Sequence, residues 1–333
     1  MGKLKVFEAF AGIGSQRMAL RNLNINHEVV GICEIDKFAI ESYKAIHGEI
    51  NNLGDISKVS IDDIPDHDLL TYSFPCTSLS RAGKQEGLIK GKTKSGLLYE
   101  CERIIENKRP KYLLLENVRD LVSKKFKEDF DKWLKYLENL GYKNYWKIIN
   151  AKHCNIPQNR ERVFVVSIRN DLNQNFEFSE IQELTTKVQD LIEDKVSDSY
   201  YVDMKDKINL IIKDNKVLIP QATKKGYIEM MLGGVCDLSY PTSKTRRGRV
   251  QGNGTVCPTL TATKQSIVII EKDAKIRNLT AKECWRLMGF SDEDYEKASG
   301  VCSENKLYKQ AGNAIVVNVL ESIFKNLLID YIK

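Results

Sequence analysis

The 333-residue sequence has no long hydrophobic run and no closely spaced pair of cysteines, and it contains only four histidines. Its longest apolar stretches, such as residues 112–115 and 163–166, are far shorter than the roughly 20 residues that cross a bilayer. The N-terminus has no signal-peptide pattern, because Lys3, Lys5 and Glu8 interrupt its apolar run. We therefore expect a soluble, cytoplasmic protein without a membrane partner.

The cysteines are scattered along the sequence, with no Cys-x-x-Cys pair. They stand at positions 33, 76, 101, 154, 236, 257, 284 and 302. This spacing argues against a zinc site and a disulfide framework, and it fits a reducing cytosol. We expect no metal, and most of these cysteines should be small buried hydrophobic residues.

The charge balance is only mildly basic, at +6 with an isoelectric point near 8.7. It permits a nucleic-acid partner without requiring one. Residues 238–270 contain no acidic residue but five cations: Lys244, Arg246, Arg247, Arg249 and Lys264. This distribution predicts a local basic surface, for which an ordinary solvated loop is the alternative interpretation.

The first 170 residues alternate strand-like and helix-like segments. Strands are predicted at 4–10, 29–33, 69–74, 112–116 and 162–168, and helices at 15–23, 37–46, 97–106 and 126–140. The alternation predicts an α/β fold with a mostly parallel sheet covered by helices on both faces. In such sheets ligands bind beyond the carboxyl ends of the strands.

The alternation weakens after residue 169, where short polar runs and turn residues predict a second, smaller and irregular domain. Regular structure is expected again as a strand at 267–270 and helices at about 280–288 and 314–328.

The turn at residues 10–15 follows the first predicted strand and opens a helix. Its small residues, Gly12 and Gly14, let the backbone approach a nucleotide-like ligand. Arg17 stands where a dinucleotide-binding fingerprint has its third glycine, which disfavours an NAD site. Glu34, at the end of the second strand, is placed to hold two ribose hydroxyls. The turn therefore indicates a site for a single nucleoside such as adenosine, with a plain tight turn as the alternative.

Cys76 lies at the carboxyl end of a predicted strand, directly after Pro75. A lone cysteine is usually an inert core residue, but this position is typical of a functional thiol. The Gly- and Lys-rich segment 81–96 that follows is expected to be a mobile lid suited to phosphate contacts, or else an ordinary surface loop.

Further polar residues flank two other predicted strands. Glu116 ends an apolar strand, where an unpaired buried carboxylate would be costly. Gln158, Arg160 and Arg162 alternate along an extended segment and are expected to share one face. Either set has a structural salt-bridge group as its alternative interpretation.

Six motifs occur in a fixed order along residues 6–319. They are the glycine turn, Pro-Cys-x-x-x-Ser, Glu-Asn-Val, Gln-x-Arg-x-Arg, Arg-Leu-Met-Gly-Phe at 286–290 and Gly-Asn-Ala at 312–314. In this order they resemble the motif series of the bacterial-type DNA (cytosine-5)-methyltransferase family. Thr77 and Ser15 depart from a common Gln and Gly of that series, without removing a catalytic group.

The resemblance implies a Rossmann-like, S-adenosylmethionine-dependent enzyme that methylates C5 of a flipped-out cytosine in duplex DNA. In this interpretation the Cys76 thiolate attacks C6 of the ring. Glu116 contacts N3, Arg162 contacts O2, and Arg160 supports Arg162. The cofactor S-adenosyl-L-methionine is expected at Phe10, Gly12, Gly14, Glu34, Ile35, Asp55, Ile56, Pro75 and Asn313.

The resemblance also implies a division of the chain. Residues 1–186 and 265–333 are expected to form the catalytic domain, and residues 187–264 the target-recognition domain. DNA contacts are expected from Ser80, Arg246, Arg247, Arg249 and Thr259. We expect a monomer in the bacterial cytosol, or a phage-encoded one in the host cytosol, with a cognate restriction endonuclease as a functional partner.

Two alternatives stay open at this point. A tRNA methyltransferase resembling the eukaryotic-type homologues would lack a long recognition domain, so the 187–264 segment counts against it. A catalytically silent DNA-binding protein would not need the complete set of catalytic positions that this sequence contains.

Overall fold

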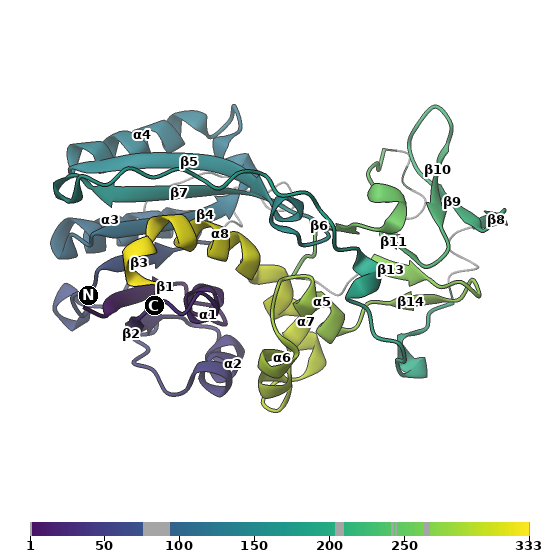
Figure 1. Ribbon diagram of the computed structural model, residues 1–333, viewed down its shortest axis with the longest axis horizontal. Helices are drawn as coiled ribbons and strands as arrows, with labels where there is room; N and C mark the ends of the chain where they lie inside the picture. Colours follow the sequence, from purple (N-terminus) through teal and green to yellow (C-terminus); the bar gives the residue numbers. More distant parts are fainter. Residues whose placement is uncertain are drawn as a thin grey trace. The chain divides into compact units, whose positions relative to one another are not determined.

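The computed structural model describes residues 2–75, 94–203, 210–240, 243, 245–262 and 267–332 (Figure 1). The chain divides into two compact units. Unit 1 comprises residues 1–149, 161–180 and 319–333, and unit 2 comprises residues 150–160 and 181–318. None of the helices in the described ranges has the length and apolar character needed to cross a membrane.

Unit 1 contains a six-stranded sheet in the order β2-β1-β3-β4-β7-β5. Its strands are β1 (Leu4–Ala9), β2 (His27–Cys33), β3 (Leu69–Tyr72), β4 (Tyr112–Val118), β5 (Tyr142–Asn150) and β7 (Glu161–Arg169). Strands β2, β1, β3 and β4 are parallel, whereas β7 runs antiparallel to β4. The predicted α/β fold with a mostly parallel sheet is confirmed. Strand β5 was not predicted, because polar residues interrupt its apolar alternation.

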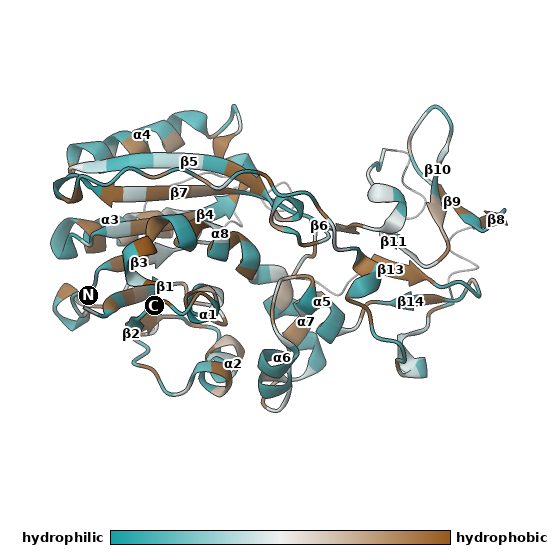
Figure 2. Cartoon of the chain, in the orientation of Figure 1, coloured by the Kyte–Doolittle hydropathy of each residue, from teal (hydrophilic) through white to brown (hydrophobic). Residues whose placement is uncertain are grey.

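Five helices accompany this sheet: α1 (Ser15–Asn22), α2 (Lys37–His47), α3 (Leu98–Lys108), α4 (Lys127–Asn139) and α8 (Val317–Leu327). Alternate residues of the strands, such as Phe7, Leu70 and Leu113, share a buried cluster with Ile104 of α3 and Trp133 of α4. Figure 2 shows the corresponding pattern: β7 is largely hydrophobic (brown), whereas α4 contains both hydrophilic (teal) and hydrophobic residues. Burial of one helix face against the sheet therefore produces the core of unit 1.

The strand directions bring several chain segments to one edge of the sheet. Ala9 pairs with Tyr72, and Tyr72 pairs with Leu115, so the carboxyl ends of β1, β3 and β4 lie next to one another. Because β7 is antiparallel, its first residues lie at the same edge, where Val118 pairs with Arg162. This edge is where a parallel sheet presents ligand-binding groups.

Unit 2 contains short strands in three small sheets. Strands β8 (Ile211–Lys213), β9 (Lys216–Pro220) and β10 (Tyr227–Met231) form one antiparallel sheet, and β11 (Gly234–Asp237), β13 (Ile267–Ile270) and β14 (Ile276–Asn278) form another. Strand β6 (Gln158–Asn159) pairs in parallel with β12 (Cys257–Pro258). Val217 and Met230 share a core with Cys236 and Ile270, so the two antiparallel sheets pack together. The segment expected to be irregular thus contains strands too short for a clear apolar alternation.

The remaining helices of unit 2 are α5 (Ala281–Arg286), α6 (Asp292–Ser299) and α7 (Glu304–Asn313), of which α6 and α7 were not predicted. The compact units also divide the chain at other positions than the expected boundaries at 186 and 264. Strand β13 pairs with β11, so residues on both sides of position 264 share one sheet. The assignment of target recognition to residues 187–264 concerns function and stays a prediction.

Candidate active site and target-recognition segment

The turn after β1 has an unusual backbone. Phe10, Gly12 and Gly14 all have positive φ angles, of 57°, 57° and 80°. A Cβ atom on Gly14 would lie 2.6 Å from Nε2 of His47, whereas one on Gly12 would meet no atom within 4 Å. Packing therefore requires glycine at position 14, and the open space beside Gly12 leaves its backbone accessible.

Glu34 connects the ends of β2 and β1. Its carboxylate accepts hydrogen bonds from the backbone N–H groups of Gly12 (2.9 Å), Ile35 (2.8 Å) and Asp36 (2.8 Å). Asn52 fixes its backbone through two further hydrogen bonds of 3.1 Å. Ile35 is 75% exposed, which leaves an apolar side chain beside this carboxylate. Glu34 and the glycine turn, both predicted for the same ligand, therefore lie in direct contact.

Asp55 and Ile56, which are also expected to contact the cofactor, have different environments. Oδ1 of Asp55 accepts hydrogen bonds from the hydroxyl (2.7 Å) and backbone N–H (3.1 Å) of Ser57. These bonds hold the pKa of the Asp55 carboxyl below its usual range, so it stays charged at neutral pH. Ile56 is buried, and its carbonyl accepts a hydrogen bond from Arg103 (3.2 Å).

The chain that leaves β3 is held from two sides. Nδ2 of Asn117 donates to the carbonyl of Phe74 (3.0 Å), and the hydroxyl of Ser95 donates to the carbonyl of Pro75 (2.7 Å). These bonds fix the backbone that leads to residue 76. Asn117 has a positioning role that the sequence analysis missed, although it belongs to the Glu-Asn-Val motif.

Glu116 and Arg162 form an ion pair at the sheet edge. Nε of Arg162 lies 3.2 Å from Oε1 of Glu116, and the glutamate is only 8% exposed. The pair follows from the β4–β7 register, in which Arg162 lies opposite Val118, two residues from Glu116. Because water is largely excluded, each charge strongly influences the other. The structure thus brings together the two side chains that were expected to contact the base.

Arg160 has backbone carbonyls among its hydrogen-bond partners. It lies in unit 2, is 4% exposed, and donates to the backbone carbonyls of Leu260 (2.9 Å), Gly312 (3.0 Å) and Ala314 (3.0 Å). These bonds give Arg160 a positioning role in the backbone of unit 2, and its expected place in the catalytic set stays a prediction. The guanidinium donates hydrogen bonds to backbone carbonyls that do not accept one within a regular strand or helix.

Neighbouring side chains strengthen this connection. Gln158 is fully buried, donates to the carbonyl of Leu287 (2.8 Å) and accepts from the N–H of Leu260 (3.1 Å). The hydroxyl of Thr259 donates to the carbonyl of Asn159 (2.6 Å). Thr259, which is expected to contact DNA, and the adjacent Leu260 are therefore tied to the Gln-x-Arg segment.

The Gly-Asn-Ala motif lies at the end of α7 in unit 2. A Cβ on Gly312 would lie 2.2 Å from the carbonyl carbon of Thr261, so only glycine permits this backbone approach. Asn313 is the exposed last residue of the helix. Its side chain is thus available for the contact that the resemblance implies.

The three arginines expected to contact DNA have different environments. Arg249 is 1% exposed and donates to the backbone carbonyls of Asp237, Ser239 and Tyr240, so its burial favours a positioning role, and its expected contact with DNA stays a prediction. Arg246 is half-buried and pairs with Asp237. Arg247 is exposed, and its Nε donates to the carbonyl of Ala222 (2.8 Å). Sequence alone could not separate these roles.

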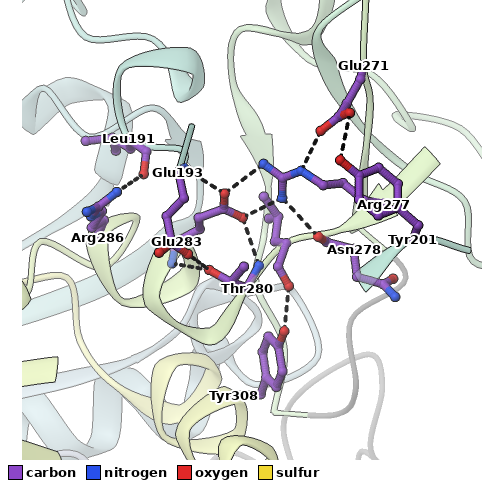
Figure 3. Close-up of polar contacts among 11 residues, drawn as sticks. Leu191, Glu193, Tyr201, Glu271, Arg277, Asn278, Thr280, Glu283, Arg286 and Tyr308 are labelled. Atoms are coloured by element: carbon purple, nitrogen blue, oxygen red, sulfur yellow. Dashed lines mark hydrogen bonds and ion pairs between the residues drawn. The ribbon is translucent and has the colours of Figure 1, made fainter. Parts of the chain in front are cut away.

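A buried polar network joins several segments of unit 2 (Figure 3). Arg277 of β14 and Glu283 of α5 form two contacts, of 3.0 and 2.8 Å, and neither is more than 2% exposed. Nε of Arg277 also lies 2.9 Å from Glu271. Thr280 and Glu283 form a capping box at the start of α5. The network therefore fixes β14 against the beginning of this helix.

The same network includes the first residues of the 187–264 segment. The N–H of Glu193 donates to Glu283 (2.9 Å), and the hydroxyl of Thr280 donates to Glu193 (2.6 Å) (Figure 3). Arg286 donates to the carbonyl of Leu191 (3.0 Å). Residues more than 80 positions apart in sequence are thus held together by side chains.

Seven cysteines lie in the described part of the chain, and all are buried. Burial raises the pKa of Cys33 to about 12 and raises the pKa of four others: Cys101, Cys236, Cys257 and Cys284. The prediction that most cysteines are buried is confirmed. Cys76, Ser80 and the segment 81–93 lie outside the described residues. Within the residues that are described, no group of three or more His, Cys, Asp or Glu could hold a metal ion.

Comparison with known proteins assigns the class. The family model for C-5 cytosine-specific DNA methylases matches residues 4–328, and the chain belongs to this family. The type II methyltransferase M2.ScrFI of Lactococcus lactis subsp. cremoris is 39% identical over 97% of this chain and 99% of that protein. The orphan methyltransferase M.SPBetaI of Bacillus phage SPbeta is 32% identical over 100% of this chain and 99% of that protein.

Solved structures agree on the fold. The Schizosaccharomyces pombe Dnmt2 methyltransferase matches with a TM-score of 0.69 at 22% identity, over 98% of this chain and 99% of that one. The protein is therefore a DNA (cytosine-5-)-methyltransferase with a Rossmann-like fold, and the resemblance seen in the sequence is confirmed.

Proposed function

We propose that this enzyme transfers a methyl group from S-adenosyl-L-methionine to C5 of a cytosine flipped out of duplex DNA. The proposal assigns the nucleophile to Cys76 and the contacts with the base to Glu116 and Arg162. The observation that carries it is the shielded Glu116–Arg162 pair, 3.2 Å apart, at the sheet edge where the backbone leading to residue 76 is fixed by Asn117.

The other cysteines support Cys76 by elimination. The seven described cysteines are buried, and burial raises the pKa of five of them, so a reactive thiolate is disfavoured there. Cys76 alone follows a strand end held by Asn117 and Ser95.

Cytosine C5 is a poor nucleophile until a thiolate adds to C6. In the proposed reaction the sulfur of Cys76 forms a bond to C6, and the C5–C6 electron pair becomes available at C5. Glu116 holds a proton at N3, and Arg162 holds O2, so the charge that develops on the ring is stabilised. After C5 has gained the methyl group, a solvent water molecule takes the C5 proton, the Cys76 thiolate is expelled as the C5–C6 double bond reforms, and the proton at N3 returns to Glu116.

The residues at the ends of β1 and β2 fit the proposed cofactor. The open space beside Gly12 admits a ligand close to the backbone, and the Glu34 carboxylate retains acceptor capacity for ribose hydroxyls. Exposed Ile35 offers an apolar surface for adenine. When bound, S-adenosyl-L-methionine supplies a methyl group from a sulfonium sulfur, which leaves as a neutral thioether. Further proposed contacts are Phe10, Gly14, Asp55, Ile56, Pro75 and Asn313.

Target recognition is proposed for residues 187–264, with Arg246, Arg247, Thr259 and Ser80 as DNA contacts. Arg249 is assigned to positioning because it is buried. The similar type II and orphan methyltransferases support two settings for this enzyme, namely beside a restriction endonuclease of the same specificity or alone.

The test uses duplex DNA in which cytosine is replaced by 5-fluorocytosine. Fluorine cannot leave as the C5 proton does, so the wild-type protein with S-adenosyl-L-methionine should form a stable covalent adduct that survives denaturation. Cys76→Ala should form none while it retains DNA affinity, and the control Cys154→Ala should form the adduct. Mass spectrometry would locate the adduct.

Absence of an adduct with the wild-type protein would contradict the covalent route. Labelled methyl transfer separates the substrates: label in tRNA but not in duplex DNA would refute the proposed function. Sequencing of methylated DNA from an expression host without cytosine methylation would identify the target.

A further inference from the structure

Tyr240 is conspicuous on the surface of unit 2. Its side chain is 74% exposed, the second-highest exposure among the large hydrophobic residues of the described chain that are exposed. Its φ of 48° is unfavourable for a residue with a Cβ atom. An exposed ring on a strained backbone indicates that surrounding contacts hold it in place.

The side chain of Arg249 holds the backbone of this turn through hydrogen bonds. Its Nη1 donates to the carbonyls of Asp237 (2.9 Å) and Ser239 (2.7 Å), and its Nη2 donates to the carbonyl of Tyr240 (2.6 Å). Asp237 in turn accepts from the N–H (2.8 Å) and hydroxyl (2.6 Å) of Ser239. Burying a guanidinium costs free energy unless it is hydrogen-bonded, and here its hydrogen bonds all go to one short turn. The conformation of this turn is therefore well fixed.

A cation lies beside the exposed ring, and others occur on the connected segments. The guanidinium of Arg246 lies 5.8 Å from the centre of the Tyr240 ring and pairs with Asp237. The N–H of Ala222 donates to the carbonyl of Arg246 (3.0 Å), which joins this segment to the chain beside exposed Lys224. Arg247 is exposed on the same segment. The surroundings therefore combine an aromatic ring with positive charge.

We propose that Tyr240 contacts the target duplex directly, by packing its ring against a base, and that Arg249 is the residue that positions it. The proposal rests on the proposed DNA methylation and adds a recognition residue to it. Nucleic acid is the occupant that matches this chemistry, because an aromatic ring can pack against the apolar edge of a base in a duplex groove, and phosphates bind the neighbouring arginines. The absence of acidic residues from positions 238–270 agrees with a polyanionic partner.

The first experiment compares Tyr240→Ala, Tyr240→Phe and the control Ile211→Ala, which truncates another exposed apolar residue of unit 2 (54% exposed). Affinity is measured for a duplex that the wild-type protein methylates, at several salt concentrations. Tyr240→Ala should weaken binding about 10- to 100-fold without changing the salt dependence, because stacking involves no counterion release. Tyr240→Phe and Ile211→Ala should bind within about threefold of wild type.

The second experiment tests positioning by Arg249. Arg249→Lys keeps the charge but cannot reach three carbonyls at once, so it should weaken binding to a similar degree. In the Tyr240→Ala background the same change should add little, since both act through one ring. Additive losses would refute positioning through Tyr240.

The outcomes separate this inference from the proposed function. If wild type methylates duplex DNA and Tyr240→Ala binds it equally well, the inference is wrong and the function stands. If Tyr240→Phe loses as much affinity as Tyr240→Ala, stacking by the ring is refuted. If wild type methylates no DNA, the proposed function itself fails.

Discussion

The two units use arginine in different ways. In unit 1 Arg162 pairs with the carboxylate of Glu116 at the end of two strands. In unit 2 Arg160 and Arg249 are buried, and each donates hydrogen bonds to three backbone carbonyls. Long paired strands satisfy their own backbone, whereas short strands and loops leave carbonyls that need donors. Arginine offers five N–H donors in a planar fork, so it can replace missing secondary structure.

The comparison predicts that removing a carboxylate has different consequences in the two units. In unit 1, Glu116→Gln should lower kcat about 10²- to 10⁴-fold, because glutamine cannot supply the proton at N3. Stability should change little, since an amide oxygen can still accept from Arg162. Single-turnover methyl transfer and thermal unfolding measure the two effects, with Glu161→Gln as the exposed control. Activity within a few-fold of wild type would remove Glu116 from its proposed role.

In unit 2, Glu283→Ala should reduce the free energy of unfolding by about 3 to 5 kcal/mol, because Arg277 would remain buried without its main counter-charge. Urea denaturation measures this loss. The control Asp292→Ala removes the partner of Arg286, which is 47% exposed, and should cost less than about 1 kcal/mol. Equal losses in the two variants would show that burial does not distinguish these pairs.

Glu8 in unit 1 gives a pH-dependent prediction. Complete burial raises the pKa of its carboxyl to about 7, although the hydroxyl of Tyr43 donates to it (2.8 Å). Because the folded-state pKa exceeds the unfolded value near 4.5, the protonated form stabilises the fold, and this contribution is lost as pH rises from about 4.5 to 7.

Glu8→Gln should remove this loss. The free energy of unfolding of Glu8→Gln minus that of the wild-type protein should therefore increase by about 3 kcal/mol when the pH is raised from 5 to 8. Urea titrations at the two pH values measure the difference, and exposed Glu28→Gln is the control. A constant difference between Glu8→Gln and wild type at both pH values would contradict the raised pKa.

The smallest expected effect concerns backbone packing in unit 2. Gly312→Ala should destabilise the protein by about 2 kcal/mol, because the new Cβ would overlap the backbone at Thr261. Gly300→Ala is the matched control, since its Cβ would lie at least 3.5 Å from other atoms. Thermal unfolding compares them. If both variants unfold like wild type, the close approach at Gly312 is not a constraint.

Prediction from sequence succeeded best in unit 1. The alternation of strands and helices indicated a mostly parallel sheet, and such a sheet gathers its strand ends at one edge. Glu34 and Gly12 were therefore expected at one ligand site, and they are in contact. The antiparallel direction of β7 was not visible in the sequence, yet it determines that Arg162 lies beside Glu116.

In unit 2 the residue types alone were misleading. Arg160, Arg249 and Arg277 carry the same charge, but their roles depend on acceptors elsewhere in the chain. Arg160 binds carbonyls at least 100 positions away. Tyr240 gave no sequence signal, because exposure and a positive φ are properties of the folded turn.

The order of motifs and the apolar periodicity by themselves determined the family, the sheet fold and the set of candidate groups, since these depend on local residue pattern. Only the tertiary structure decided which arginines pair with a carboxylate and which support the backbone. The reason is that a buried donor takes whatever acceptor the fold brings within about 3 Å, and that choice is made by segments distant in sequence.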